Sequence, residues 1–221
     1  IALAVAAVCT GGFALGLGSI WYGIVPGLLG GVIVYFFLAR RTFNQFESLV
    51  KQAQQQIQSR NVDAAVRTLK EGYPLAKWQF LVESQLNAQI GSFLFQAQRE
   101  DEAEPYLEDA FSRHWQAQAM LGVYYYKNKK LEKMRETFED AVAYNRKQPL
   151  LWNIYAYCLW KSRNRDEAID VLNRALDKLP DDDKKTEKNL ENLKNGNKMK
   201  MGGWGQQWYQ FRLQTPPRQG G

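Results

Sequence analysis

Apolar and polar residues divide this chain into two blocks that meet at Arg40. The first thirty-nine residues carry no charged side chain, whereas all 29 basic and 23 acidic residues lie from Arg40 onward. A helix needs about 20 residues to cross a hydrocarbon core roughly 30 Å thick, so the first block has room for two short spans. The pattern predicts a transmembrane helical hairpin over residues 1–40, with helices at about 1–17 and 23–39.

Arg40 and Arg41 directly follow the second expected span. Lys and Arg collect on the cytoplasmic side of membrane spans, so the rest of the chain is expected on that side, together with the N-terminal end of the hairpin. Gly23, Gly27 and Gly31 fall four residues apart and line one face of the second span. Such a face lets another helix approach closely, either the first span or a separate membrane protein.

Three other interpretations of the apolar block remain open. A cleaved signal peptide would need a charged front end, and none is visible. This argument is weakened because the sequence does not begin with Met. A lipoprotein would use Cys9, but Val8 stands where a small residue is needed. A buried soluble hairpin is the third interpretation, and a run this long without charge is rare in a soluble core.

After Phe43 the apolar residues recur with a helical period in segments separated by short polar breaks. Four of these segments are alike, because each has a small or apolar residue followed four positions later by a larger apolar one. The pairs are Ala65 and Leu69, Ala103 and Leu107, Met134 and Phe138, and Ala168 and Leu172, with spacings of 38, 31 and 34 residues between units. A period of this length predicts stacked helical hairpins, since no single hairpin can bury its apolar face alone.

The last unit resembles the tetratricopeptide repeat family most closely. Its matching residues are Trp152, Ala156, Ala168, Leu172, Ala175 and Pro180. The second and third units match through Ile90, Gly91, Leu94, Ala103, Leu107 and Ala110, and through Leu121, Gly122, Tyr125, Met134, Phe138 and Ala141. The first unit is degenerate, with Gln52 and Gln56 at positions that are usually apolar. The resemblance implies an all-α fold, an α-solenoid of about four helix pairs over residues 41–180 that wind as a right-handed superhelix.

Two further segments follow the repeats. Residues 181–197 open with three aspartates, which suit the positive end of a helix dipole, and are expected to form a capping helix. Residues 198–221 form an irregular basic tail that holds Trp204, Trp208, Tyr209 and Phe211. Four aromatic residues indicate a segment that orders against a surface, either its own repeats, a partner or the membrane.

The family holds extended peptides or helices on the concave face made by the first helix of each pair. The resemblance implies which residues of this chain occupy the same inward positions. They are Gln85, Ser92, Phe95, Gln116, Val123, Tyr126, Lys127, Asn153, Tyr157, Trp160 and Lys161. Aromatic rings with amide neighbours suit peptide recognition. Tyr124, Tyr125 and Tyr126 are consecutive, however, so at least one of them must point into the core of a helical pair. Acidic residues from Glu100 to Asp109 and basic residues from Lys127 to Arg135 are expected to attract one another across successive units.

Composition argues against catalysis. His114 is the only histidine, the two cysteines Cys9 and Cys158 form no cluster, and no glycine-rich phosphate loop follows a strand. We therefore expect no enzyme, no cofactor and no metal. The net charge of +6 comes mainly from residues 184–218, which makes the tail a basic segment within a mixed chain.

The expected function is that of a membrane-anchored scaffold or adaptor, a non-catalytic subunit of a bacterial inner-membrane assembly with its repeats in the cytoplasm. Its expected partners are the lipid bilayer and other membrane or cytoplasmic proteins, and self-association as a homo-oligomer is left open. The alternative is a peripheral lipid or nucleic-acid binder that acts through the basic aromatic tail. The favoured interpretation includes no nucleic acid.

Overall fold

The computed structural model describes residues 20–76, 80–180 and 183–216. The chain forms two compact units, Ile1–Gln52 and Ala53–Gly221. The first expected span, at about residues 1–17, lies outside the described residues. The described residues form helices and no strands, in agreement with the all-α expectation.

Helix α2 (Ile20–Gln58) begins in the first unit and contains the second expected span. Large apolar side chains from Leu29 to Phe43 are exposed on it, with exposed fractions from 55% at Ile33 to 69% at Phe37. Gly23, Gly27 and Gly31 fall on this helix, but the packing of their face lies outside what the structure describes. Within residues 20–76, 80–180 and 183–216, no helix combines the length and the apolar character needed to cross a membrane.

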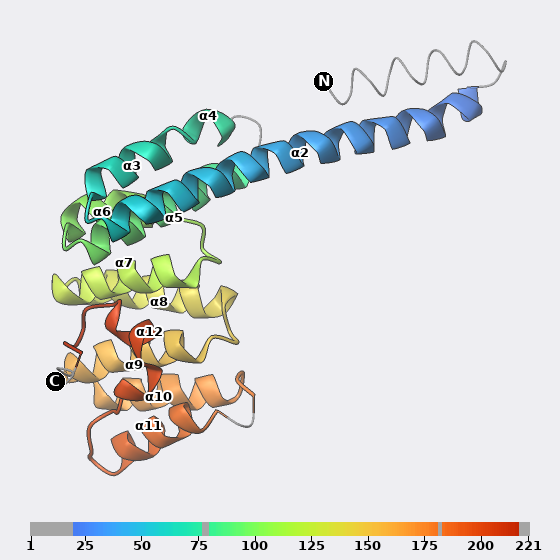
Figure 1. Cartoon of the computed structure of the whole chain (residues 1–221). Helices are drawn as coiled ribbons and strands as arrows, with labels where there is room; N and C mark the ends of the chain where they lie inside the picture. The colour runs from blue at the N-terminus through green and yellow to red at the C-terminus, as the bar shows by residue number, and fades with distance from the viewer. Residues whose placement is uncertain (1–19, 77–79, 181–182, 217–221) are drawn as a thin grey trace. The chain divides into compact units, whose positions relative to one another are not determined.

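The second unit is a stack of helical pairs (Figure 1). After the last turns of α2 come α3 (Val62–Lys70) and the short α4 (Tyr73–Ala76). The next pairs are α5 (Phe80–Gln96) with α6 (Glu100–Glu108), α7 (Trp115–Lys127) with α8 (Leu131–Tyr144), and α9 (Pro149–Lys161) with α10 (Arg165–Leu176). Helix α11 (Lys184–Lys194) packs on α10, and the tail contains the turn η1 (Gly202–Trp204) and α12 (Gln206–Tyr209).

Close approach of the two helices in each pair explains the period that the sequence displays. An added Cβ at Gly122 would come within 2.5 Å of the Phe138 ring, and one at Gly91 within 2.7 Å of Leu107. Both large side chains are fully buried. In these two pairs a glycine of the first helix therefore faces a large apolar residue of the second helix, which fills the seam between them. This is the reason that small and large residues recur at fixed positions in successive pairs.

Each pair turns through the same backbone conformation. Arg60, Gln98, Lys129 and Arg163 have positive φ angles between 58° and 68°, and each stands two residues before the start of a second helix. The next residue donates its N–H to a carbonyl five positions back, as in Lys130 N to Tyr125 O at 2.9 Å. These are Schellman turns, in which one left-handed residue ends a helix and satisfies its last carbonyls.

Helix α11 ends in a fifth turn of the same kind, although the sequence suggested only a cap there. Gly196 has φ +78°, and Asn197 N donates to Asn192 O at 2.7 Å. Gly196 lies 33 residues after Arg163, so the period of the repeats continues. Helix α11 thus takes the place of the first helix of a fifth unit, and the tail follows where a second helix would begin.

Candidate functional site: the inner face and the tail

The first helices of successive pairs, α5, α7 and α9, pack beside one another and form the inner face of the second unit. The tail runs over this face. It contacts α11 through Lys200, α9 through Trp208, α7 through Phe211 and α5 through Arg212. In Figure 1 the tail is the red segment beside the middle helices of the stack.

Two aromatic side chains hold the tail in place. Trp208 and Phe211 are fully buried. The Trp208 ring meets Tyr157 of α9 edge to face, with centroids 4.9 Å apart, and Phe211 lies 6.2 Å from the ring of Trp115 at the start of α7. Burial of rings of this size and their edge contacts are among the strongest apolar interactions a short segment can make.

Polar contacts satisfy the indole N–H of Trp208 and the hydroxyl of Tyr157. The Trp208 Nε1–H donates to Gln214 Oε1 at 2.9 Å, and Gln214 Nε2 donates to the Tyr157 hydroxyl at 3.2 Å. Burial raises the pKa of Tyr157, so its hydroxyl stays neutral. Arg212 donates to the carbonyl of Gln96 at the end of α5 at 3.2 Å. These bonds fix the direction of the tail across the face.

Near α11 the tail is joined by a buried amide network. Asn189 donates to Asn153 Oδ1 at 2.8 Å and accepts from the backbone N–H of Lys200 at 2.7 Å. Asn153 also donates to the Thr186 hydroxyl at 2.7 Å. Lys185 donates to Gly203 O at 2.8 Å, and its ammonium lies 4.5 Å from the ring centre of Trp204. One side chain, Asn189, therefore couples α9, α11 and the tail.

The residues that the resemblance placed in the groove divide into two groups. Phe95, Val123 and Asn153 are fully buried, and Ser92 and Tyr157 are buried as well. The Ser92 hydroxyl bonds its own helix at Ala88 O. Asn153 belongs to the amide network, and Tyr157 is covered by the tail. These side chains contribute to packing and to contacts within the chain.

The remaining groove residues are partly or fully exposed: Gln85, Gln116, Tyr126, Lys127, Trp160 and Lys161. Lys127 pairs with Glu100 at 2.5 Å and lies 5.1 Å from the Phe95 ring centre. The Lys161 ammonium lies 4.6 Å from the ring centre of Trp160. Of the four tail aromatics, Trp208 and Phe211 are buried on the repeats, while Trp204 and Tyr209 keep part of their surface accessible.

Contacts of the repeats with their own tail could not be read from residue patterns. Trp115 was missed because it begins a helix outside the repeating positions, and Gln96 contributes only a backbone carbonyl. Arg212 and Gln96 are 116 residues apart in the chain. The one available signal was four aromatic residues in a segment too rich in Gly and Gln to fold alone.

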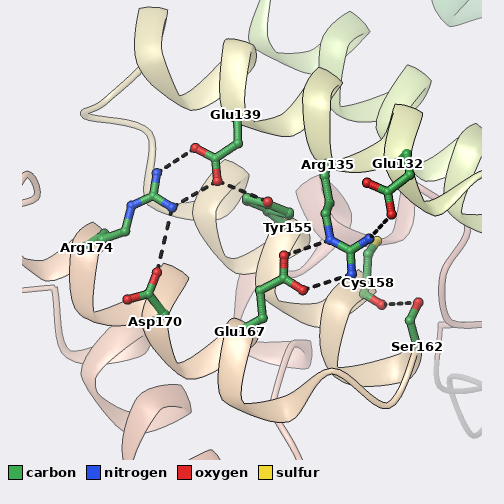
Figure 2. Close-up of polar contacts among 9 residues, drawn as sticks. All are labelled: Glu132, Arg135, Glu139, Tyr155, Cys158, Ser162, Glu167, Asp170 and Arg174. Atoms are coloured by element: carbon green, nitrogen blue, oxygen red, sulfur yellow. Dashed lines mark hydrogen bonds and ion pairs between the residues drawn. The ribbon is translucent and has the colours of Figure 1, made fainter.

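Charged side chains link the second helices of neighbouring pairs, as Figure 2 shows for α8 and α10. Arg135 binds Glu167 through two hydrogen bonds of 2.8 and 3.0 Å. Arg174 binds Glu139 in the same way at 2.9 and 2.6 Å, and it lowers the pKa of that carboxyl. The Tyr155 hydroxyl donates to Glu139 at 3.0 Å. Similar contacts occur one unit earlier, where Lys130 pairs with Glu104 at 3.3 Å. The expected attraction between successive units is confirmed.

Little reactive chemistry lies on the described surface. Across residues 20–76, 80–180 and 183–216, no three His, Cys, Asp or Glu side chains gather to hold a metal ion. Burial raises the pKa of the Cys158 thiol, and a protonated thiol is a poor nucleophile. His114 caps helix α7, since its Nδ1 accepts from Ala117 N at 3.3 Å. The conspicuous feature of the site is therefore a surface of paired helices with a peptide segment upon it.

Stacked helical pairs with a shared inner face define the class, a helical-hairpin repeat protein of the α-solenoid type. Residues 116–148, which cover α8 and all of α7 but its first residue, match the family model described as tetratricopeptide repeat, so the chain contains a repeat of this family. The resemblance seen in the sequence is confirmed for this unit. Comparisons with curated proteins and with solved structures found no match. Tetratricopeptide repeats commonly bind other proteins and are generally not catalytic.

Proposed function

We propose that this protein is a membrane-anchored scaffold whose repeats hold a partner protein at the membrane surface. One observation carries the anchoring part: large apolar side chains, among them Leu29, Val32 and Phe36, are 55% to 69% exposed on α2 just before Arg40 and Arg41. Surfaces this apolar are normally covered by lipid or by protein. The uncharged sequence before them favours lipid.

The repeats supply the binding part of the proposal. Tetratricopeptide repeats commonly mediate contacts with other proteins, and among the described residues no three His, Cys, Asp or Glu side chains gather to hold a metal ion. We place the repeats on the cytoplasmic side of a bacterial inner membrane because Arg40 and Arg41 follow the apolar block. The partner is then a membrane or cytoplasmic protein, and the protein is a non-catalytic subunit of their assembly.

The anchoring is tested by fractionating cells that express the full chain. We expect the protein in the membrane pellet after an alkaline carbonate wash, and we expect the combined substitutions Leu29→Asp, Val32→Asp and Phe36→Asp to release most of it. Tyr144→Asp is the matched control, because Tyr144 is 60% exposed on α8 and its change should leave the protein in the pellet. Wild-type protein in the soluble fraction would exclude the anchor.

The orientation and the partner need separate measurements. Protease added to intact spheroplasts should spare the repeats, and it should digest them once the membrane is opened. Crosslinking in mild detergent should then join the chain to a second protein. A chain that remains alone under these conditions would argue against the scaffold role.

The two buried aromatic residues of the tail do not favour the alternative of a nucleic-acid binder. Proteins that bind single-stranded nucleic acid stack its bases on accessible aromatic side chains. Trp208 and Phe211 have no accessible surface in this structure. The tail would have to leave the repeats before these rings could stack on a base.

A further inference from the structure

We propose that the inner face is a binding site for a short helical segment with two aromatic side chains three residues apart and a following arginine, and that the tail is its tethered occupant. A partner segment with the same chemistry binds by displacing the tail. This inference deepens the proposed function, because it names the surface and the class of ligand that the scaffold uses.

The tail has the properties of a bound ligand. Its regular structure is limited to the three-residue turn η1 and the four-residue helix α12, which are too short to be stable in isolation. Its order comes from contacts with α11 through the Lys200 backbone N–H and with α9, α7 and α5 through the side chains of Trp208, Phe211 and Arg212. A segment that folds only against another surface can also leave it.

Two aromatic positions define the recognition. Trp208 and Phe211 are both fully buried and lie three residues apart in one helical turn, in which Phe211 N donates to Trp208 O at 3.1 Å, so they point to the same side of the tail. Their ring partners, Tyr157 and Trp115, come from two different pairs. The site therefore exists only where the pairs stack, and the distance between stacked helices sets the spacing of the two aromatic residues.

Polar contacts add selectivity beyond the two rings. Arg212 follows Phe211 directly and donates to Gln96 O, a carbonyl at the end of α5. Gln214 bridges Trp208 Nε1 and the Tyr157 hydroxyl. A segment that kept the two aromatic residues but lacked the counterparts of Arg212 and Gln214 would lose the hydrogen bonds to Gln96 O and to the Tyr157 hydroxyl. It would therefore bind less tightly.

The connection between α11 and the tail is short and exposed. Residues 195–198 are all exposed, and Gly196 adopts a positive φ angle of +78° that glycine accommodates readily. A tether this short gives the tail an effective concentration on the order of millimolar at its own site. A free partner at micromolar concentration must therefore bind about 1,000-fold more tightly than the untethered tail to compete equally.

The test cuts the tether and leaves every contact residue in place. A site for a specific protease is inserted between Asn197 and Lys198, both exposed, in the full chain in detergent. After cleavage we expect the tail fragment to dissociate on dilution while circular dichroism shows the helices retained. A labelled synthetic peptide of residues 199–214 should then bind saturably to the cleaved protein, and only weakly to uncut protein.

Two competitor peptides establish the ligand class. An unrelated peptide that keeps Trp, Phe and Arg at the spacing of residues 208, 211 and 212 should displace the labelled peptide. The tail peptide with Trp208→Ala and Phe211→Ala should compete at least about 100-fold less well, because each buried ring is expected to act as a binding hot spot. Equal competition by the two peptides would overturn the proposal.

Loss of helix after cleavage would show that the tail belongs to the core, and this too would overturn the proposal. Should the inserted site itself prevent folding, uncut Trp208→Ala protein is used, and labelled peptide should bind it at least about 10-fold more tightly than it binds wild type. Failure of any of these binding results leaves the fractionation test of membrane anchoring untouched. The two proposals can therefore fail independently.

Discussion

At the scale of single residues, the turns within the pairs place four ordinary side chains in a conformation that favours glycine. Lys129 has φ +58° and is exposed, so its side chain is free of the core. We expect Lys129→Gly to stabilise the protein by up to about 1 kcal/mol, because the left-handed conformation costs other residues more than glycine. The free energy of unfolding in urea measures the change.

Glu136→Gly is the control for this prediction, because Glu136 is also exposed but lies within α8. Glycine inside a helix is expected to cost about 1 kcal/mol relative to alanine. Changes of the same sign in both variants would show that the positive φ angle at Lys129 does not determine the effect.

His114 provides a pH-dependent contribution to stability. Its Nδ1 accepts the Ala117 N–H, which only the neutral ring can do, and burial lowers the pKa of His114. A lowered folded pKa means that the stability is complete above the ordinary value of about 6.5 and is lost as the pH falls through the folded pKa. We expect unfolding free energy to decline below about pH 6.5 in wild type.

His114→Asn should keep the cap and remove this decline, since asparagine is a good N-cap residue that does not titrate. The comparison is clean because the chain has no other histidine. Urea unfolding at several pH values between 5.5 and 7.5 measures it. A slope that persists in His114→Asn would assign the dependence to other groups.

At the scale of paired helices, the seam between α7 and α8 depends on the absence of a side chain at Gly122. We expect Gly122→Ala to destabilise by about 1–3 kcal/mol despite its better helix propensity, because the new methyl would meet the buried Phe138 ring at 2.5 Å. Combining it with Phe138→Leu should cost less than the sum of the two single changes. Thermal unfolding of the four proteins completes the cycle.

Gly203→Ala is the matched control for the seam, since its Cβ would meet only Lys185 Cε at 3.9 Å. Its unfolding free energy should stay within about 0.5 kcal/mol of wild type. If the double variant showed no coupling between positions 122 and 138, the ring contact would not be the cause of the loss.

The pairs themselves were predictable from the sequence because their packing is local and repeated. Ala65 and Leu69, like the corresponding residues of later units, are fully buried, and the four-residue offset comes directly from helix geometry. The degenerate first unit also fits, because Gln56 accepts a hydrogen bond from Thr68 at 3.0 Å across the pair. An amide can occupy this seam since it finds a polar partner there.

At the scale of the whole second unit, the sequence did not predict where the tail lies. Its contacts join residues far apart in the chain, and an irregular segment has no period from which a face can be deduced. The sequence predicted only a capping helix there, and the structure shows both the fifth turn at Gly196 and the path of the tail across the inner face after it. The assignment of groove residues depended on the position of the tail, because the tail covers Tyr157.

Asn189 gives the last prediction, because it couples the end of the stack to the tail. Asn189→Ala would leave Asn153 Oδ1 and the Lys200 N–H without their partner, and we expect a loss of about 2–3 kcal/mol. In a stacked protein each unit depends on its neighbours, so the loss should be uneven along the chain. Hydrogen exchange should quicken in α9, α11 and the tail, and it should change little in α5 and α6.

Asn195→Ala is the control, since Asn195 is exposed just beyond α11. It should leave the exchange of all these helices near the wild-type rate. Uniform acceleration through α5 to α11 in Asn189→Ala would mean that the second unit opens only as a whole. The tail could then leave the inner face only on global unfolding, and displacement by a partner would be too costly to occur.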